Sequence, residues 1–335
     1  MIAIKEAVDA DRRPGRFIVT GSADVLTLPK VTESLAGRME RHTLWPLAQG
    51  EIDRREPQFL EHLFAGNRPP RAEQVTRGNL INRLLHGGYP EAVQREDDER
   101  RTAWLANYFD ALIQRDLRSI ADVKHLDELP RVVRIIASAA PGTVNLNNVS
   151  RESRIPRSSL DRYVALLTQI YVLVRLPAWS ANVGTQQVRA SRMAIVDSAL
   201  MAYLLGVTRE TLKQWDATRI GGLLENFVAM ELVKEASWTT HGVTLFHWRS
   251  TKQHEVDLVL QDRDGRVAAI EVKAAASVDS SDFSHLRRLR EVTGERWVQG
   301  VVLHTGSTFA SFGEGLAAWP VSALWTGDDW NEAKS

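Results

Sequence analysis

Residues 254–274 read HEVDLVLQDRDGRVAAIEVKA, and this stretch decides the fold of the C-terminal part of the chain. The runs HEVDLVLQ and VAAIEVKAA are predicted strands, and the DRDG sequence between them is typical of a tight turn. We therefore expect the two strands to pair as a hairpin. Because alternate residues of a strand share a face, Asp257 should lie close to Glu271, with Lys273 on the same face.

These residue types suggest a metal site. Two neighbouring carboxylates repel each other unless a cation lies between them, so Asp257 and Glu271 are candidate ligands of Mg²⁺ or Mn²⁺. Lys273 could hold a water and stabilise the charge that develops on a phosphate. Glu225, in the predicted helix LLENFVAMEL, is a candidate further ligand. The alternative is a salt-bridged strand pair on a solvated face, with Lys273 neutralising Glu271.

The elements around the hairpin extend this pattern. The helix that carries Glu225 is followed by the strand LFHWR, the hairpin, the helix SSDFSHLRRLREVTG and the strand VQGVVLHTG. This αβββαβ order predicts an open sheet flanked by helices. Together with Glu225, Asp257, Glu271 and Lys273, it resembles the PD-(D/E)XK nuclease superfamily. The resemblance implies phosphodiester hydrolysis with these four residues as catalytic groups, and with Glu225, Asp257 and Glu271 at the metal.

Residues 128–192 are predicted to form a helix, a short helix, a turn, a longer helix and a β-wing, which is the order of a winged helix-turn-helix. Seven arginines and two acidic residues lie in residues 151–192. Arginines near a helix N-terminus are good phosphate ligands. The candidate DNA contacts around the turn are Arg151, Arg154, Arg157 and Arg162, and Arg189 and Arg192 could touch DNA from the wing. A solvated helix face or a protein contact is the alternative.

The N-terminal part contains an apolar run, Phe17-Ile18-Val19, that predicts a short buried strand ending in the sequence TGS. Residues 57–127 have helical periodicity, with a Gly-Gly-Tyr-Pro break after NLINRLLH and a broad apolar stripe in RRTAWLANYFDALIQ. A lone buried strand needs neighbours, and no other strand is predicted ahead of it.

Several segments carry a wider resemblance, which covers essentially the whole chain. The strand ending in TGS, the segments SLAGR and LWPLAQGE, and the motifs GGYPEAV and VDSALMAYLLG are similar to those of prokaryotic AAA+-like P-loop ATPases. The C-terminal half of that family is a conserved domain of unknown function that combines a winged helix with a restriction-endonuclease-like fold. The resemblance implies nucleotide sensing by Ser22 and Arg38. The alternative is a turn residue and a surface charge.

This family should begin with a Walker A loop and a Walker B strand, and neither motif is in the sequence. Residue 1 is expected to lie just after the Walker B strand. Without the Lys and Ser/Thr of the P-loop, nothing cradles the nucleotide phosphates. We therefore expect ATP to bind only in a full-length relative, and we expect no ATPase activity of this chain alone.

The composition limits the functional classes. The 335 residues include no cysteine, which excludes disulfides, zinc ribbons and thiol catalysis. Residues 1–193 hold 28 Lys and Arg against 23 Asp and Glu, while the rest hold 14 against 19. The net charge of zero argues against indiscriminate coating of nucleic acid but leaves room for a local basic patch. No signal peptide or membrane span is predicted, so a cytoplasmic protein is expected, with homo-oligomers possible.

The sequence thus predicts a mixed α/β chain with four units. These are a truncated ATPase-core remnant in residues 1–56, a helical region in 57–127, a winged helix in 128–192 and a nuclease-like domain in 193–330. The first functional hypothesis is a metal-dependent endonuclease that acts on DNA. The alternatives are a non-catalytic DNA-binding or regulatory module, and an ATPase-family relative that lacks its motor.

Overall fold

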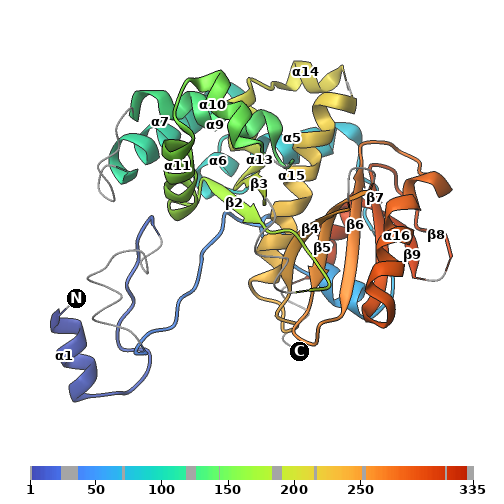
Figure 1. The fold of residues 1–335 in the computed structure, drawn as a ribbon, viewed down its shortest axis with the longest axis horizontal. Coiled ribbons are helices and arrows are strands. Elements are labelled where there is room, and N and C mark those ends of the chain that lie inside the picture. The colour runs from blue at the N-terminus through green and yellow to red at the C-terminus, as the bar shows by residue number, and fades with distance from the viewer. Residues whose placement is uncertain are drawn as a thin grey trace.

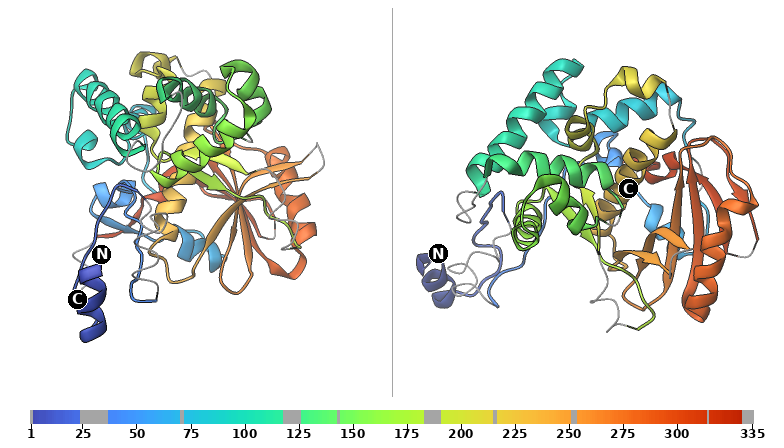
Figure 2. Two further views of the ribbon diagram at one scale, coloured as in Figure 1. Left: turned by 60° about the vertical axis from the view of Figure 1, so that its left-hand side comes forward. Right: turned by 45° about the horizontal axis from the view of Figure 1, so that its top comes forward.

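Figure 1 shows the computed structural model, which describes residues 2–23, 37–69, 72–117, 126–142, 144–182, 191–214, 217–250, 254–313 and 315–329. Helices gather on one side of the long helix α15 (Ala217–Ala236), and a six-stranded sheet lies on its other side. The second view in Figure 2 shows the same two parts. The chain is therefore mixed α/β, as predicted. None of the helices in these ranges has the length and apolar character needed to cross a membrane.

The described helices ahead of α15 are spread over the first two thirds of the chain. Their bounds are α1 (Ile2–Ala10), α3 (Gln49–Ile52), α4 (Phe59–Phe64), α5 (Arg77–His86), α6 (Pro90–Val93), α7 (Asp98–Ala111), α9 (Leu129–Ala139), α10 (Leu146–Ser153), α11 (Arg157–Gln169), α13 (Ser198–Leu205) and α14 (Arg209–Lys213). A π-helical turn, Leu112–Asp116, extends α7. The helical periodicity predicted for residues 57–127 is thus confirmed over the described part.

The sheet has the strand order β4-β5-β6-β7-β9-β8. Its strands are β4 (Thr244–Arg249), β5 (Glu255–Gln261), β6 (Val267–Lys273), β7 (Trp297–His304), β8 (Ala310–Ser311) and β9 (Leu316–Pro320). The pairs β4–β5, β5–β6 and β8–β9 are antiparallel, whereas β6–β7 and β7–β9 are parallel. Helix α16 (Ser284–Thr293) lies between β6 and β7 in sequence. The predicted αβββαβ order is therefore observed.

The two faces of the sheet pack against different helices because side chains alternate along each strand. Val259, Ala269 and Val302 share a core with Leu286 and Leu289 of α16. Their neighbours in sequence belong to the larger core, which includes α15. The hairpin turn forms as predicted, since Asp262 Oδ1 accepts from the backbone N–H groups of Asp264 and Arg266 at 3.1 and 2.8 Å.

The segment between α9 and β3 also follows the predicted order. Helices α9, α10 and α11 precede two antiparallel strands, β2 (Leu173–Leu176) and β3 (Arg192–Ile195). Arg189 falls outside the described residues. The β2–β3 pair lies against the sheet rather than apart from it, because the Trp179 N–H donates to His247 O of β4 at 2.6 Å. The assignment of this unit as a winged helix stays a prediction.

Helix α15 contacts the chain around α3 and α4 through three buried charged side chains. Glu231 accepts from the N–H of Gln49, the first residue of α3, at 2.7 Å. Glu235 accepts from the N–H of Leu60 in α4 at 2.8 Å. Lys234 donates to Glu231 at 2.8 Å and to Leu47 O at 3.0 Å. Buried carboxylates of one helix thus satisfy the orphan N–H groups at the starts of two others.

A second contact connects the two ends of this packed body. Strand β1 (Arg55–Pro57) pairs antiparallel with β10 (Gly327–Asp329). Only glycine fits at position 327, since a Cβ there would lie 1.9 Å from the Glu56 carbonyl oxygen. Helix α4 also contacts β7. The packing therefore continues across the boundary predicted between residues 56 and 57, and the predicted division into units stays a prediction.

The GGYP motif has a clear structural reason. Gly87 ends α5 with a φ of +63°, and a Cβ there would lie 2.3 Å from Asp197 Oδ1. The Gly88 N–H donates to Asp197 Oδ2 at 2.7 Å. Asp197 also caps α13 by accepting from the Ala199 N–H at 2.9 Å. The two glycines therefore allow one buried carboxylate to join α5 to α13.

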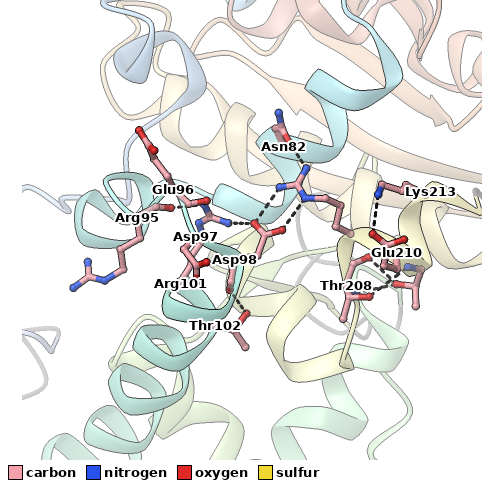
Figure 3. A network of polar contacts seen from close by, with 12 residues as sticks. Asn82, Arg95, Glu96, Asp97, Asp98, Arg101, Thr102, Thr208, Glu210 and Lys213 are labelled. Atoms are coloured by element: carbon pink, nitrogen blue, oxygen red, sulfur yellow. Dashed lines mark hydrogen bonds and ion pairs between the residues drawn. The ribbon is translucent and has the colours of Figure 1, made fainter.

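An ion-pair network joins α7 to α14 on the helical side, and Figure 3 shows it from close by. Asp98 accepts from Arg209 Nε at 2.7 Å and from Arg101 Nη1 at 2.5 Å. The Arg101 side chain is buried and also donates to Glu96 O at 3.1 Å. The Arg209 guanidinium, with a smaller contribution from Arg101, lowers the pKa of Asp98 to about 2, so the network stays charged at neutral pH.

One predicted element is wrong. Residues Phe17, Ile18 and Val19 form no strand, and all three side chains are exposed, Ile18 to 91%. An extended segment becomes a buried strand only when neighbouring strands accept and donate its backbone hydrogen bonds. No described strand pairs with these residues. Figure 1 shows that α1, which precedes them, lies away from the two packed parts.

Replacing Glu235 with Gln should flatten the pH dependence of stability. Burial raises the pKa of Glu235 to about 8, against the opposing effect of its hydrogen bond from Leu60. The folded chain thus holds a proton that the unfolded chain releases from about pH 4.5 upward, so stability falls as pH rises through this window. One such group contributes at most about 1.4 kcal/mol per pH unit.

Urea denaturation at several pH values between about 5 and 8 would measure this dependence, because the slope of stability against pH reports bound protons. Glu210→Gln, on the exposed side of α14, is the matched control and should decline like the wild type. An equally steep decline in Glu235→Gln would contradict the assignment.

Candidate functional site

The paired carboxylates lie where the β5–β6 hairpin opens. The last backbone pair toward the open end joins Leu258 to Ile270. One step further along the same register, Asp257 stands opposite Glu271. Asp257 Oδ2 accepts from the Val272 N–H at 3.0 Å, so its side chain takes over a backbone donor at the point where the ladder ends. The hairpin therefore brings the two predicted metal ligands together.

Glu271 is the more deeply buried of the two. Its side chain is 8% exposed, and its Oε1 accepts no hydrogen bond. His285 Nδ1 of α16 lies 3.6 Å from that oxygen. Burial first, and then the negative charge of Asp257, raise the pKa of Glu271 well above its ordinary value. A buried carboxylate oxygen without a partner is costly, and a proton or a cation would relieve that cost.

Glu225 joins this group from helix α15. Burial, and then the charge of Asp257, raise the pKa of Glu225 to about 8, although Arg192 and Lys273 oppose the rise. Three of the four predicted catalytic residues are therefore carboxyl groups, and the charge of Asp257 acts on the other two. Clusters of this kind, with strongly perturbed pKa values, occur more often at functional sites than elsewhere.

Lys273 occupies the rim of the cluster. Its side chain is 41% exposed, and its Nζ lies 3.5 Å from Asp282 Oδ1 in the short helix that precedes α16. His285 is a neighbour that the sequence did not single out. Its Nδ1 lies 2.8 Å from the carbonyl oxygen of Glu255, and its ring meets that of His254 edge to face at 5.5 Å. His285 is thus a neighbour of both Glu255 and Glu271.

Arg192 is the residue that sequence reasoning misplaced. It was predicted to touch DNA from the wing, but its side chain is only 6% exposed and points into the carboxylate cluster. Nη1 donates to Asp257 O at 3.2 Å and lies 3.5 Å from Asp257 Oδ1, and Nη2 pairs with Glu255. Burial opposes its charge, but Asp257 and Glu255 outweigh burial and raise the pKa of Arg192.

Strand β3, which carries Arg192, is held in place by a side chain of α15. Asn226 Oδ1 accepts from the Ile195 N–H at 2.8 Å, and its Nδ2 donates to Ile195 O at 2.9 Å. A buried amide that satisfies both backbone groups of one residue specifies its position tightly. The only signal in the sequence was a single arginine at the start of the apolar run RMAIV. Nothing in that run names its partners, Asp257 and Glu255.

The carboxylates of the cluster are the right type of ligand for a divalent cation, but they are not arranged around a common point. Carboxylate oxygens are the ligands that Mg²⁺ and Mn²⁺ prefer, and Glu271 offers one without a hydrogen bond. Within the described residues, however, no three His, Asp or Glu side chains are arranged so that they could hold a metal ion together. The positive charge next to Asp257 comes instead from the Arg192 guanidinium.

The four candidate DNA contacts lie on the surface of the α10–α11 region. Arg151 is in α10, Arg154 ends that helix with a φ of +62°, and Arg157 and Arg162 belong to α11. All four are exposed. Arg151 donates to Asn148, and Arg157 pairs with Asp161. The turn between the helices therefore presents positive charge to solvent.

The candidate nucleotide-sensing residues lie in the N-terminal segment. Ser22 is exposed, and Arg38 Nε donates to Asp9 Oδ1 of α1 at 2.6 Å. The exposure of Ser22 and the contact of Arg38 with α1 are neither evidence for a phosphate site nor evidence against one. Their sensing role stays a prediction.

Three family models match parts of the chain. An AAA domain matches residues 1–53, a domain of unknown function (DUF8612) matches residues 77–211, and a second one (DUF4143) matches residues 220–324. The last match begins in α15 and contains the whole hairpin with Asp257, Glu271 and Lys273. The α10–α11 region and Arg192 lie within the DUF8612 match.

The curated relatives have low sequence identity to this chain. Uncharacterized proteins of Mycobacterium tuberculosis and Mycobacterium bovis are each 24% identical over 275 residues, which is 82% of this chain and 56% of theirs. One from Methanocaldococcus jannaschii is 20% identical over 250 residues, 73% of this chain and 52% of its own. The chain thus spans about half the length of these relatives, and no solved structure matches it. These matches make the chain similar to an AAA-like family that carries domains of unknown function.

Proposed function

We propose that the chain is a DNA-processing protein whose cluster around Asp257 hydrolyses phosphodiester bonds with a bound Mg²⁺ or Mn²⁺. One observation carries the proposal. Asp257 and Glu271 meet where the β5–β6 hairpin opens, Lys273 follows two residues later on the same strand, and the charge of Asp257 acts on Glu225 of α15. The similarity to an AAA-like family supports nucleotide sensing by Ser22 and Arg38 only in a full-length relative, in which a P-loop would hold the nucleotide.

Each residue of the cluster has a task in this proposal. Asp257, Glu271 and Glu225 would hold the cation, which supplies Lewis-acid stabilisation of the phosphate and a more acidic water. Lys273 is on the rim, where a half-exposed ammonium can hold the attacking water or offset charge on the phosphate. His285, within reach of Glu271, is available to donate a hydrogen bond to the substrate side of the cluster.

The exposed arginines around the α10–α11 turn would hold the DNA backbone. Phosphate contacts by arginine position a protein on DNA without reading its sequence. Glu152 and Asp161 are the acidic residues of this region, so positive charge dominates it. DNA is therefore the proposed partner of this surface.

A second candidate function is a non-catalytic DNA-binding or regulatory module. Two observations favour it: Arg192 already pairs with Asp257, and no group of three ligands in the described ranges is arranged for a metal. In this case the nuclease-like fold is a scaffold, and the carboxylate cluster stabilises the contact between β3 and the sheet.

Cleavage assays separate the two candidates. The wild type should nick plasmid DNA with Mg²⁺ or Mn²⁺, and Asp257→Asn, Glu271→Gln and Lys273→Ala should each lower the rate by at least about a hundredfold. Asp264→Asn, in the exposed turn of the same hairpin, is the control and should cut normally. A folded wild type that cuts no form of DNA in either cation would leave the binding module as the function.

DNA affinity tests the arginine surface independently of cleavage. Replacing Arg151, Arg154 and Arg162 by Ala should weaken binding to duplexes of any sequence. It should also reduce the slope of log K against log salt by about 0.9 for each lost phosphate contact. Fluorescence anisotropy in EDTA at several salt concentrations gives both quantities. Arg288→Ala, on the exposed side of α16, is the control, and an unchanged slope in the triple variant would rule out this surface.

A further inference from the structure

The acidic cluster contains a cation of its own. The Arg192 guanidinium enters from β3, donates to the backbone and faces the carboxylate of Asp257, and pairs with Glu255 through its other nitrogen. Its side chain and that of Asp257 are both largely buried. Arginine remains protonated in proteins, so this positive charge cannot be removed by a change of pH. It can be removed only by movement of the side chain.

A divalent cation and this guanidinium need the same oxygen. Asp257 Oδ2 accepts from the Val272 N–H, and Oδ1 is the oxygen that faces Arg192. A metal ion at Oδ1 would therefore lie next to a buried positive charge, and the two would repel each other in surroundings that screen poorly. Glu271 Oε1 is buried and accepts no hydrogen bond. The cluster therefore has a second carboxylate oxygen that a cation could bind.

The arginine belongs to a different part of the fold from the carboxylates. Strand β3 pairs with β2, which follows α11 directly in sequence. Asn226 fixes Ile195 at one end of β3, whereas Arg192 is at the other end, three residues away. Movement of the Arg192 end of β3, with Ile195 held by Asn226, would thus withdraw the guanidinium while the carboxylates stay in the sheet.

We propose that Arg192 is a built-in counter-ion that competes with a divalent cation for Asp257, so that the centre binds the cation tightly only when the guanidinium withdraws. This inference rests on the proposed cation site. It adds a means of regulation: the position of the Arg192 end of β3 controls whether the centre is filled.

Mn²⁺ binding to the full chain, measured by the loss of the free-ion electron paramagnetic resonance signal, tests the proposal without any cleavage. Arg192→Gln should bind Mn²⁺ at least about tenfold more tightly than the wild type, since removal of a nearby positive charge favours the ion. Arg192→Lys keeps the charge on a shorter, unforked group, and should bind with an affinity between the two. Arg175→Gln, exposed on the neighbouring strand β2, should match the wild type.

The outcomes are separable. Tighter binding by Arg192→Gln that disappears in Arg192→Gln/Asp257→Asn would support competition at Asp257. Equal affinities of the wild type and both Arg192 variants would overturn the competition, while the cation site itself would stand if Asp257→Asn abolished binding. Binding by none of the proteins would overturn both the competition and the proposed cation site. If Arg192→Gln failed to fold, as circular dichroism would show, Arg192→Lys alone would decide, with unchanged affinity counting against the proposal.

Discussion

Burial of helix α15 is the constraint on which the rest of the structure depends. A helix enclosed on one side by helices and on the other by a sheet must satisfy every polar side chain it carries. Asn226 holds both backbone groups of Ile195, and Glu231 and Glu235 each accept an N–H at the start of a preceding helix. Each of these contacts avoids the cost of an unpaired buried polar group. The same helix directs Glu225 toward the carboxylate cluster.

The cluster itself shows how a protein tolerates several acids in one place. Glu225 and Glu271 have raised pKa values, so the folded chain favours their protonated forms. Asp257 relies on a backbone N–H and on Arg192 instead. Protons thus neutralise Glu225 and Glu271, and Arg192 neutralises Asp257. A divalent cation could replace either kind of positive charge.

The parts of the structure that were predictable depend on neighbours in sequence. The period of two along residues 254–274 was enough to place Asp257 beside Glu271, and the DRDG turn set the pairing. Arg192 was misplaced because its partners lie 63 and 65 residues further along the chain, where no local pattern points to them. The contact of Gln49 with Glu231 spans 182 residues and was missed for the same reason. The run from Phe17 to Val19 was misread because apolar character alone does not supply a strand with partners.

The pairing of β1 with β10 has a consequence for how the chain is connected. Arg55 stands opposite Asp329, so the start of one strand and the end of the other lie side by side. Residues 55–329 thus form a closed loop, and Leu47 and Gln49, ahead of that loop, are bound to it through Lys234 and Glu231. Arg55 and Asp329 are therefore neighbours in space, although nearly the whole chain separates them in sequence.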